Sequence, residues 1–465
     1  MRKKFLIAFI FISTTTFSQQ ETANWYFGVH AGLDFTSGSP VAISSTTLVT
    51  NEGCASISDI SGSLLFYTDG ISVWNKNHQV MPNGVGLLGG SSSTQAALIV
   101  PQPGSANFYY IFTTDEFGGS NGFRYSIVDM NLQAGNGDIT SKNVLVLNNV
   151  TEKLTAVKNA NGVDYWVAIH EWGSDAFYVY SLTSTGFQTT PVISYAGIVH
   201  SLTVNQNTYG QMKFSSCGDK LALAAGYLDT IQILDFNTTS GVVSNAIALP
   251  LYAHVYGMEL SGDGHLLYAS TYDPSGTLVQ FDLAAGNTAA IIASKTILSF
   301  TPDIYALQMA SDGKIYACRS FSQFLGVISS PLVQGTGCNY IDNGIDLDPN
   351  FMGITSALGL PAFVQSDFRS EIFCIANSVD ELNSGSTVIA FPNPFENNFV
   401  INFSAKNPAS EINIYDALGK CIGTFPIAID QKTFYFGSSL PTGIYFLCVK
   451  RDSGTERIKV MKALH

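Results

Sequence analysis

Charged residues are scarce in this 465-residue chain, and positively charged residues are the scarcest. Asp, Glu, Lys and Arg make up 12% of the sequence, against about 25% in typical soluble proteins. Lys and Arg number 22 and Asp and Glu 35, which gives a formal net charge of −13. Nucleic acids and anionic membranes are bound by clusters of Lys and Arg, so this charge balance argues against both classes of partner.

The mature chain also lacks a long apolar run and a metal-binding cysteine pattern. No stretch reaches the roughly 20 apolar residues of a transmembrane helix. The seven cysteines show neither Cys-x-x-Cys nor mixed Cys/His spacing, which argues against a zinc site. Cys421 and Cys448 could form a disulfide if their strands are neighbours, but most of the thiols are expected to be buried and free.

Glycine and aromatic residues are abundant, with 42 Gly, 31 Phe and 21 Tyr. Aromatic side chains on this scale can build a core, which excludes a disordered chain. Because polarity comes from Gly, Ser, Thr and Asn rather than from charge, the composition favours strands and turns over surface helices.

The N-terminus has the anatomy of a secretory signal peptide. Arg2, Lys3 and Lys4 precede the short apolar run 5–12, and small polar residues follow up to Ser18. We predict a signal peptide over residues 1–18, with an N-terminal core helix as the alternative. The mature chain is expected to be exported and soluble.

A hairpin unit recurs along the chain: an apolar strand, a turn of Ser, Asp or Asn with Gly, and a second apolar, aromatic strand. The clearest copies cover residues 212–223, 258–268 and 307–316, and their turn glycines are about 46 and 49 residues apart. Four-stranded propeller blades repeat every 40 to 50 residues or so. Weaker copies, which bring the count to six hairpins, cover residues 56–67, 98–112 and 156–166.

Alternating apolar and polar residues follow several of these hairpins, as in 124–131, 230–237 and 277–283, and indicate a third half-buried strand. A seventh blade can be assembled by pairing strands at 23–28 and 32–35 with a late strand at 354–361. Such closure removes the open sheet edges of an unclosed array. We therefore predict an all-β fold, a β-propeller of about seven blades over residues 24–366; a β-sandwich or two smaller β domains is the alternative.

No catalytic constellation is evident. His170 and Glu171 begin like a zinc-protease helix, but Ser174 occupies the position of the second His. Asp342, Asp346 and Asp348 place three carboxylates within seven positions, and Ca²⁺ could use their oxygens as ligands. Their spacing does not follow a calcium-loop pattern. A solvated acidic loop is the alternative for this segment, and no cofactor is predicted.

Propellers commonly bind ligands at the ring mouth, where the loops that lead into the innermost strands converge. Aromatic and polar side chains at these positions could stack on a sugar or clasp a peptide; the alternative is that the tyrosines only plug the channel. The predicted mouth residues are Glu52, Gln95, Lys153, Tyr209, His254, Tyr256 and Tyr305.

A linker is predicted over residues 367–388, and short alternating strands in 389–465 predict a small antiparallel sandwich. The tail carries motifs at residues 391–394, 414–420 and 440–445 and a basic last strand, with the marker residues Pro392, Asn393, Pro394, Gly419, Lys420, Gly443 and Tyr445. In these motifs and their order it resembles the type A sorting domain of the type IX secretion system of Bacteroidota. It implies export across the outer membrane through the type IX machinery; a carbohydrate-binding or adhesive sandwich is the alternative.

A second resemblance is carried by residues 24–28, 52–59, 66–70, 73–75 and 359–365. In these segments the repeat region resembles the propeller-type N-terminal domain of large Bacteroidota surface and gliding-associated proteins. This resemblance implies the class of the protein and its location at the cell surface, but it assigns no chemical role to individual residues.

Together these features predict a secreted or cell-surface protein that passes through the periplasm. We interpret it as a non-catalytic binding or adhesion propeller with a glycan or surface-protein ligand. A propeller hydrolase or lyase acting on polysaccharide would need paired carboxylates facing the channel. A structural component of a surface assembly would show an exposed apolar patch on the rim.

Overall fold

The computed structural model describes residues 20–44, 46–272, 276–369, 374, 390–391, 393, 395, 397–402, 409–416, 420–428, 431, 433–451 and 454–462. The chain divides into two compact units, Met1–Cys374 and Ile375–His465. The predicted signal peptide 1–18 lies outside the described residues, as does most of the predicted linker 367–388. The boundaries of both therefore stay predictions.

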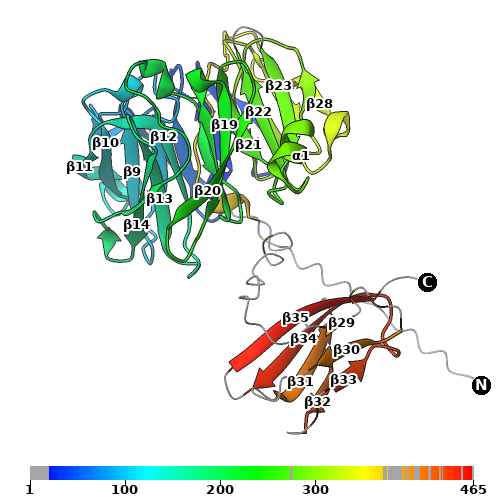
Figure 1. Cartoon of the computed structure of the whole chain (residues 1–465). Helices are drawn as coiled ribbons and strands as arrows, with labels where there is room; N and C mark the ends of the chain where they lie inside the picture. Colours follow the sequence, from blue (N-terminus) through cyan, green and yellow to red (C-terminus); the bar gives the residue numbers. More distant parts are fainter. Residues whose placement is uncertain are drawn as a thin grey trace, which may run out of the picture. The chain divides into compact units, whose positions relative to one another are not determined.

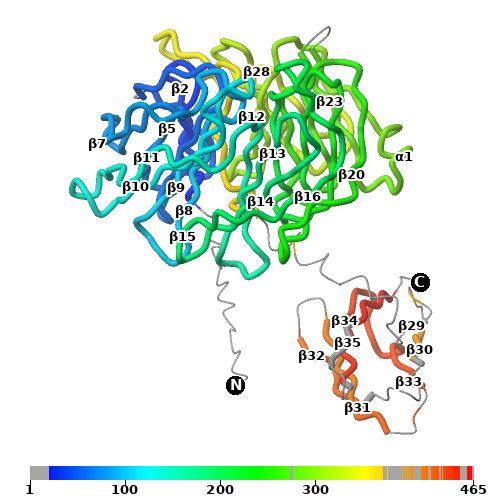
Figure 2. Tube along the Cα trace, turned by 60° about the vertical axis from the view of Figure 1, so that its left-hand side comes forward, coloured from blue at the N-terminus to red at the C-terminus, as the bar shows by residue number. Residues whose placement is uncertain are grey.

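The first unit contains seven antiparallel sheets, which stand side by side in Figures 1 and 2. Five of them have four strands that pair in chain order, so each folds as a meander. Their strands are β4 (Ala55–Ser58), β5 (Leu64–Thr68), β6 (Ser72–Asn75) and β7 (Val80–Val85); β8 (Ala97–Pro101), β9 (Phe108–Thr114), β10 (Phe123–Asp129) and β11 (Asp138–Leu147); β17 (Met212–Phe214), β18 (Lys220–Ala225), β19 (Thr230–Phe236) and β20 (Val243–Pro250); β21 (Val255–Leu260), β22 (Leu266–Thr271), β23 (Thr277–Asp282) and β24 (Thr296–Ser299); and β25 (Ile304–Met309), β26 (Ile315–Arg319), β27 (Phe324–Ile328) and β28 (Tyr340–Asp346).

Two sheets depart from the four-stranded plan. In one, both β15 and β16 pair with β14; its strands are β12 (Val150–Lys158), β13 (Tyr165–Glu171), β14 (Ala176–Thr183), β15 (Gly186–Phe187) and β16 (Val192–Tyr195). The other has three strands, β1 (Asn24–Phe27), β2 (Ala31–Asp34) and β3 (Val41–Ile43).

Helical segments are short. They are α1 (Thr288–Ala293) and the 3-10 turns Gln20–Thr22, Glu116–Gly118, Gln133–Gly135, Asn205–Asn207, Gly226–Leu228, Gly335–Cys338 and Gln365–Phe368. Within the described parts of the chain, none of the helices has the length and apolar character needed to span a membrane.

The six predicted hairpins are the first two strands of six successive sheets, so the repeat pattern is confirmed. At the three clearest turns, Gly218, Gly264 and Gly313 have φ angles of 78°, 72° and 76°, a left-handed conformation that glycine adopts without steric penalty. The first strands β4, β8, β12, β17, β21 and β25 contact one another in succession. They therefore line the axis of a ring, which is the arrangement of a seven-bladed β-propeller.

The ring closes between the two ends of the repeat region. Val29 forms an antiparallel bridge with Thr355, and its backbone N–H donates to the Thr355 carbonyl at 2.8 Å. A little further on, the N–H of Leu358 donates to the carbonyl of Asn51, and the Leu358 carbonyl accepts from the N–H of Ala306. The closing segment 354–363 thus lies between the last sheet and the sheet of β4, as predicted, but it makes isolated bridges rather than a regular strand.

Aromatic packing stabilises this closure. The Trp25 side chain in β1 is fully buried, and its ring lies 5.0 Å from Phe35, 5.6 Å from Tyr316 of β26 and 5.8 Å from Phe363 of the closing segment, centroid to centroid. Both ends of the region and the last complete sheet therefore share one core. Glycine is required beside it, because a Cβ at Gly359 would lie 1.9 Å from the Glu52 carbonyl oxygen.

The cysteine prediction is partly wrong. Cys217 and Cys374 form a disulfide across a separation of 157 residues. Cys421 and Cys448 are both free; their strands pair with opposite edges of β31 (Ala409–Asp416), so the two residues are not on adjacent strands. Most of the thiols were expected to be buried and free, but only three of the seven are, at Cys54, Cys318 and Cys338.

The second unit is a small antiparallel sandwich, as predicted. One sheet has the order β29 (Ala390–Phe391), β30 (Phe399–Asn402), β33 (Thr433–Phe436); the other has the order β32 (Cys421–Pro426), β31, β34 (Gly443–Arg451), β35 (Gly454–Lys462). Phe399 and Ile401 of the first sheet share a core with Ile412, Leu447 and Val460 of the second. This core holds the two sheets face to face.

Candidate binding pocket at the propeller mouth

A pocket of about 230 Å³ lies at one edge of the seven sheets. In an antiparallel meander, the start of the first strand and the end of the second lie at the same edge, and the lining residues come from these positions in several sheets. They are Glu52, Ser92, Phe117, Tyr209, Tyr256, Tyr272, Tyr305 and Leu358. Leu358 belongs to the closing segment, so ring closure completes the pocket.

Four tyrosines form one wall of this pocket. The rings of Tyr256 and Tyr305 meet edge to face with centroids 5.1 Å apart, and Tyr272 stacks on Tyr305 at 5.7 Å. Tyr209 lies 6.5 Å from Tyr256, and its hydroxyl is hydrogen-bonded to that of Tyr272. Because each ring is held by others from neighbouring sheets, the wall is preorganised.

Glu52 is the one carboxylate among the lining residues. Its Oε2 accepts a hydrogen bond from the Tyr256 hydroxyl at 2.7 Å, and its Oε1 accepts one from the Ser92 hydroxyl at 2.9 Å. Burial and the neighbouring Glu152 carboxylate raise the pKa of Glu52 to about 7. Near neutral pH the pocket can therefore hold either a carboxylic acid or a carboxylate.

Glu152 lies behind the pocket and organises its loops. The side chain is fully buried, and its Oε2 accepts from the backbone N–H and the hydroxyl of Thr94, both at 2.8 Å. Its Oε1 accepts from the backbone N–H of Phe117 at 2.9 Å. Glu152 therefore holds the turn that presents Phe117, although burial raises its own pKa.

Four of the seven predicted mouth residues, Glu52, Tyr209, Tyr256 and Tyr305, line the pocket. Lys153 does not: it is fully buried, and its Nζ donates to the carbonyls of Thr208 and Tyr209 at 2.8 and 2.7 Å. Burial lowers the pKa of Lys153 to about 7. The prediction placed this residue in the mouth, but its ammonium group satisfies backbone carbonyls instead.

His254 and Gln95 also lie outside the pocket lining. His254 Nδ1 is 2.7 Å from Asp229 Oδ1, and its ring stacks on Tyr227. Gln95 is buried on the axis, where its Oε1 accepts from the N–H of Met212 at 2.8 Å. Gln95 therefore joins first strands rather than facing a ligand.

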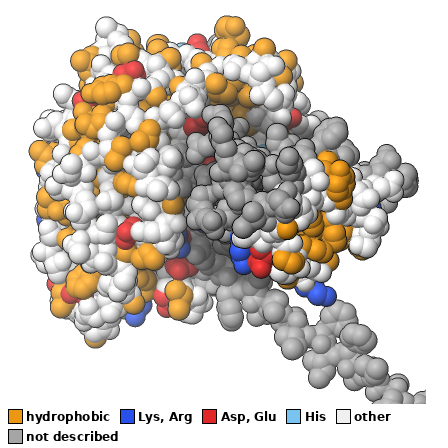
Figure 3. Space-filling model, turned by 60° about the horizontal axis from the view of Figure 1, so that its bottom comes forward, with side chains coloured by type: hydrophobic (Ala, Val, Ile, Leu, Met, Phe, Trp, Pro, Cys, Tyr) orange, Lys and Arg blue, Asp and Glu red, His pale blue; other side chains and the backbone are white. Residues whose placement is uncertain are grey.

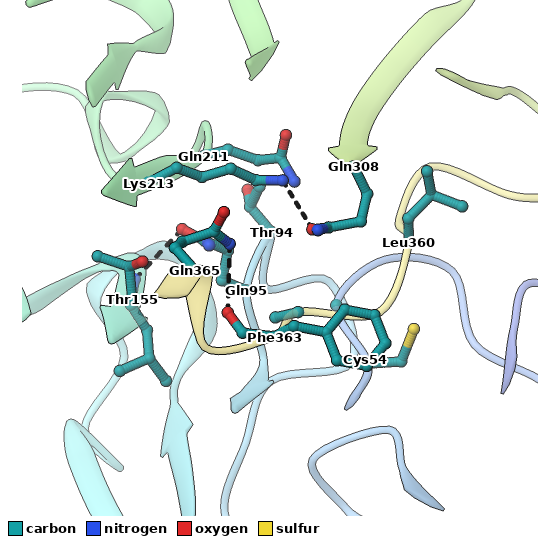
Figure 4. Close-up of a pocket in the computed structure, with 13 residues that line it drawn as sticks. Cys54, Thr94, Gln95, Thr155, Gln211, Lys213, Gln308, Leu360, Phe363 and Gln365 are labelled. Atoms are coloured by element: carbon teal, nitrogen blue, oxygen red, sulfur yellow. Dashed lines mark hydrogen bonds between the residues drawn. The ribbon is translucent and has the colours of Figure 1, made fainter. Parts of the chain in front are cut away.

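Polar side chains fill the channel around a second, much smaller cavity of about 10 Å³ (Figure 4). Lys213 Nζ donates to Glu259 Oε2 at 2.6 Å and to Gln308 Oε1 at 2.7 Å. Gln211 Oε1 accepts from the N–H groups of Met258 and Leu307 at 3.0 and 3.1 Å. These bonds cross from sheet to sheet, so polar side chains plug the channel and a ligand at the mouth does not pass through it.

The carboxylates of the acidic segment 342–348 accept hydrogen bonds from nearby backbone and hydroxyl groups. Asp348 accepts from the backbone N–H groups of Met352 and Gly353 at 2.6 and 2.8 Å, and Asp342 accepts from the Thr301 hydroxyl at 2.9 Å. Asp346 accepts from the N–H of Asp348. In the part of the chain that the structure describes, no group of three or more His, Cys, Asp or Glu residues is arranged to hold a metal ion.

The described marker residues of the second unit have structural roles. Asn393 Nδ2 donates to the Lys459 carbonyl at 2.8 Å, and its Oδ1 accepts from the N–H of Met461 at 2.9 Å, which attaches the first segment to β35. The Tyr445 hydroxyl donates to the Pro441 carbonyl at 2.6 Å. Gly443 begins β34, and Lys420 donates its N–H to Asp416. Pro392, Pro394 and Gly419 lie outside the described residues.

A closed seven-bladed propeller with a mouth pocket, followed by a small sandwich, defines the class of this protein. Residues 389–463 match the family model of the secretion system C-terminal sorting domain. Together with the motifs of the tail, this match identifies a type IX type A sorting domain. The chain is thus a β-propeller protein of the type IX export route, secreted or placed at the outer surface.

Several solved structures are similar to the chain at low sequence identity. A Lactobacillus plantarum protein is 14% identical with a TM-score of 0.42, covering 71% of this chain and 93% of its own. A putative 6-phosphogluconolactonase from Bacteroides fragilis is 11% identical with a TM-score of 0.37, covering 63% and 92%. Kluyveromyces lactis Hsv2 is 12% identical with a TM-score of 0.37, covering 66% and 90%. None of the curated proteins matches the chain.

Sequence reasoning missed Tyr272, Phe117, Ser92 and Leu358. Tyr272 follows β22 and Phe117 follows β9, so both lie at the end of a second strand. The prediction considered only the entries to first strands, and at the entry to β8 it chose Gln95 rather than Ser92. In an antiparallel hairpin, the start of the first strand and the end of the second lie at the same edge of the sheet. The sequence positions of the hairpins could therefore have predicted that Tyr272 and Phe117 lie at the mouth.

Proposed function

We propose that this protein is a non-catalytic binding or adhesion module of the cell surface or the surrounding medium, and that its ligand binds at the propeller mouth. The observation that carries the proposal is the convergence of four tyrosines and one carboxylate, from several blades, on one pocket of about 230 Å³. Such a concave, mainly aromatic site with few polar groups is typical of ligand pockets. The ligand class is a surface glycan or a surface protein.

The arrangement of carboxylates supports binding over polysaccharide cleavage. Hydrolysis of glycosides commonly uses two carboxyl groups that flank the scissile bond. Glu52 lines the pocket, but Glu152 is fully buried, accepts hydrogen bonds from Thr94 and Phe117, and is not a lining residue. Among the lining residues, only Glu52 therefore offers a carboxyl group to a substrate.

Binding can be tested with the full chain on a glycan array and on an array of surface-protein peptides. We expect Tyr305→Ala to weaken binding at least tenfold, because it removes one side of the tyrosine wall. Tyr195→Ala is the matched control, since the Tyr195 side chain is 71% exposed and belongs to β16, away from the pocket lining. A wild-type chain that binds to neither array, or binding that Tyr305→Ala leaves unchanged, contradicts the proposal.

A further inference from the structure

Exposed aromatic side chains surround the mouth. Phe117, Tyr252, Phe321 and Phe351 are 39%, 81%, 58% and 86% exposed. Phe117 and Phe321 follow second strands, Tyr252 precedes the first strand β21, and Phe351 precedes the closing segment. By the antiparallel geometry of the blades, all four positions lie at the mouth edge of the sheets.

The backbone at these four aromatics is unusual. Their φ angles are 52°, 57°, 48° and 58°, and no other Phe, Tyr or Trp in the described parts of the chain has a positive φ. Bulky residues in this left-handed region are genuine outliers, and each carries a steric penalty. Because exposed rings repay little of this by packing, the strain points to a role outside the fold itself.

Contiguous apolar surface on an exported protein marks an interaction site. On the face that Figure 3 shows, which is not the mouth, hydrophobic side chains lie among uncharged polar ones with a few charged side chains between them, in keeping with the 12% charged content of the chain. Exposed aromatic side chains at the edge that carries the pocket fit a polypeptide better than a free small molecule, because a polypeptide can insert one side chain and place its neighbours against these rings.

The chemistry of the pocket identifies the inserted side chain. Its lining has aromatic rings and the Glu52 carboxyl group, but no Lys, Arg or His among the residues that the structure describes there. Tyrosine faces attract ammonium groups, and a carboxylate supplies the countercharge. A lysine also has a four-carbon stem that can lie along aromatic walls while its ammonium group reaches the carboxylate.

We propose that the mouth face docks a protein segment whose lysine side chain enters the tyrosine pocket toward Glu52 while its apolar neighbours contact Phe117, Tyr252, Phe321 and Phe351. This inference rests on the proposed function, which it deepens by naming the ligand chemistry. The net charge of −13 favours a cationic partner as well.

Such binding depends on pH in a defined direction. The charged groups around Glu52 are Glu152 and Glu116, with Lys153 behind Glu152, and the hydroxyl groups are those of Tyr256 and Ser92. With a pKa of about 7, Glu52 is largely protonated at pH 6 and ionised at pH 8. A lysine stays charged over this range, so its binding releases a proton from Glu52. We expect the affinity to rise severalfold from pH 6 to pH 7 and to level off above pH 8.

The test uses the full chain and a peptide array in which a single lysine lies between apolar residues, each peptide paired with its Nε-acetyl-lysine twin. Acetylation removes the charge and keeps the stem, and we expect it to weaken binding at least tenfold. Glu52→Gln should weaken binding to a similar extent and abolish the pH dependence. Phe351→Gly should weaken binding severalfold without destabilising the fold, since glycine suits the left-handed φ at this exposed position.

The outcomes separate this inference from the proposed function. Equal binding of the acetylated twins, or a pH dependence that survives Glu52→Gln in a chain with an unchanged unfolding midpoint, overturns the lysine inference. Glycan binding that is sensitive to Tyr305→Ala, with no lysine peptide bound, overturns it too but leaves the proposed function standing. Absence of binding on both arrays contradicts both.

Discussion

Removal of residues 389–465 is expected to leave the protein in the periplasm of a cell that has the type IX machinery. The reason is that residues 389–463 form the sorting domain that this machinery recognises, whereas the propeller has its own core and its own closure. We expect extracellular protein to fall by at least an order of magnitude, with the truncated propeller accumulating in the periplasmic fraction. Fractionation followed by immunoblotting measures both quantities.

Two controls make this experiment specific. Tyr435→Ala changes a sorting-domain side chain that is 68% exposed, and it should leave export unchanged. Fusion of residues 389–465 to an unrelated periplasmic protein should direct that protein out of the cell. Secretion of the truncated chain at the wild-type level would refute the assignment of the tail.

Replacement of Trp25 by alanine is expected to destabilise the propeller by about 3 to 5 kcal/mol, the usual loss when a large buried aromatic is truncated in a core. Trp25 is fully buried and touches Phe35, Tyr316 and Phe363. Its loss therefore removes packing at the place where the two ends of the ring meet. Urea unfolding should show a lower midpoint, and limited proteolysis should cut near the closing segment first.

Trp74→Ala is the control, because it truncates the same type of side chain at a position away from the ring closure. Trp74 lies in the third strand of its sheet, is only partly buried, and stacks on Tyr67 at 5.5 Å. We expect a smaller loss of stability and no new cleavage near the closing segment. A Trp25→Ala midpoint equal to or above that of Trp74→Ala would show that the closure does not depend on this core.

Local sequence signals predicted most of the fold. The turn glycines mark positions where φ is positive, and the alternating residues beside them mark half-buried strands, so the positions of six hairpins follow from the sequence alone. Closure could be predicted because an open ring exposes sheet edges. The irregular path of residues 354–363 could not, since its isolated bridges leave no periodic pattern in the sequence.

The site was only partly predictable because burial depends on neighbours that are distant in sequence. Lys153 and Gln95 have polar side chains at predicted mouth positions, but backbone groups of the adjacent sheet hold them inside the channel. The Cys217–Cys374 disulfide joins residues 157 positions apart, and spacing alone cannot select such a pair. Tyr272 and Phe117, by contrast, follow from the antiparallel geometry once second strands are considered.

The mouth pocket exists only if the ring is closed, and a cysteine pair across the closure tests this directly. Val29 and Thr355 exchange both backbone hydrogen bonds, at 2.8 and 3.2 Å, and the Cα atoms of such a pair lie about 5.5 Å apart, within disulfide range. In the Val29→Cys, Thr355→Cys double variant, we predict a peptide linking the two cysteines in a non-reducing digest, with neither thiol open to alkylation. Two freely alkylated thiols at these positions would contradict the closed ring.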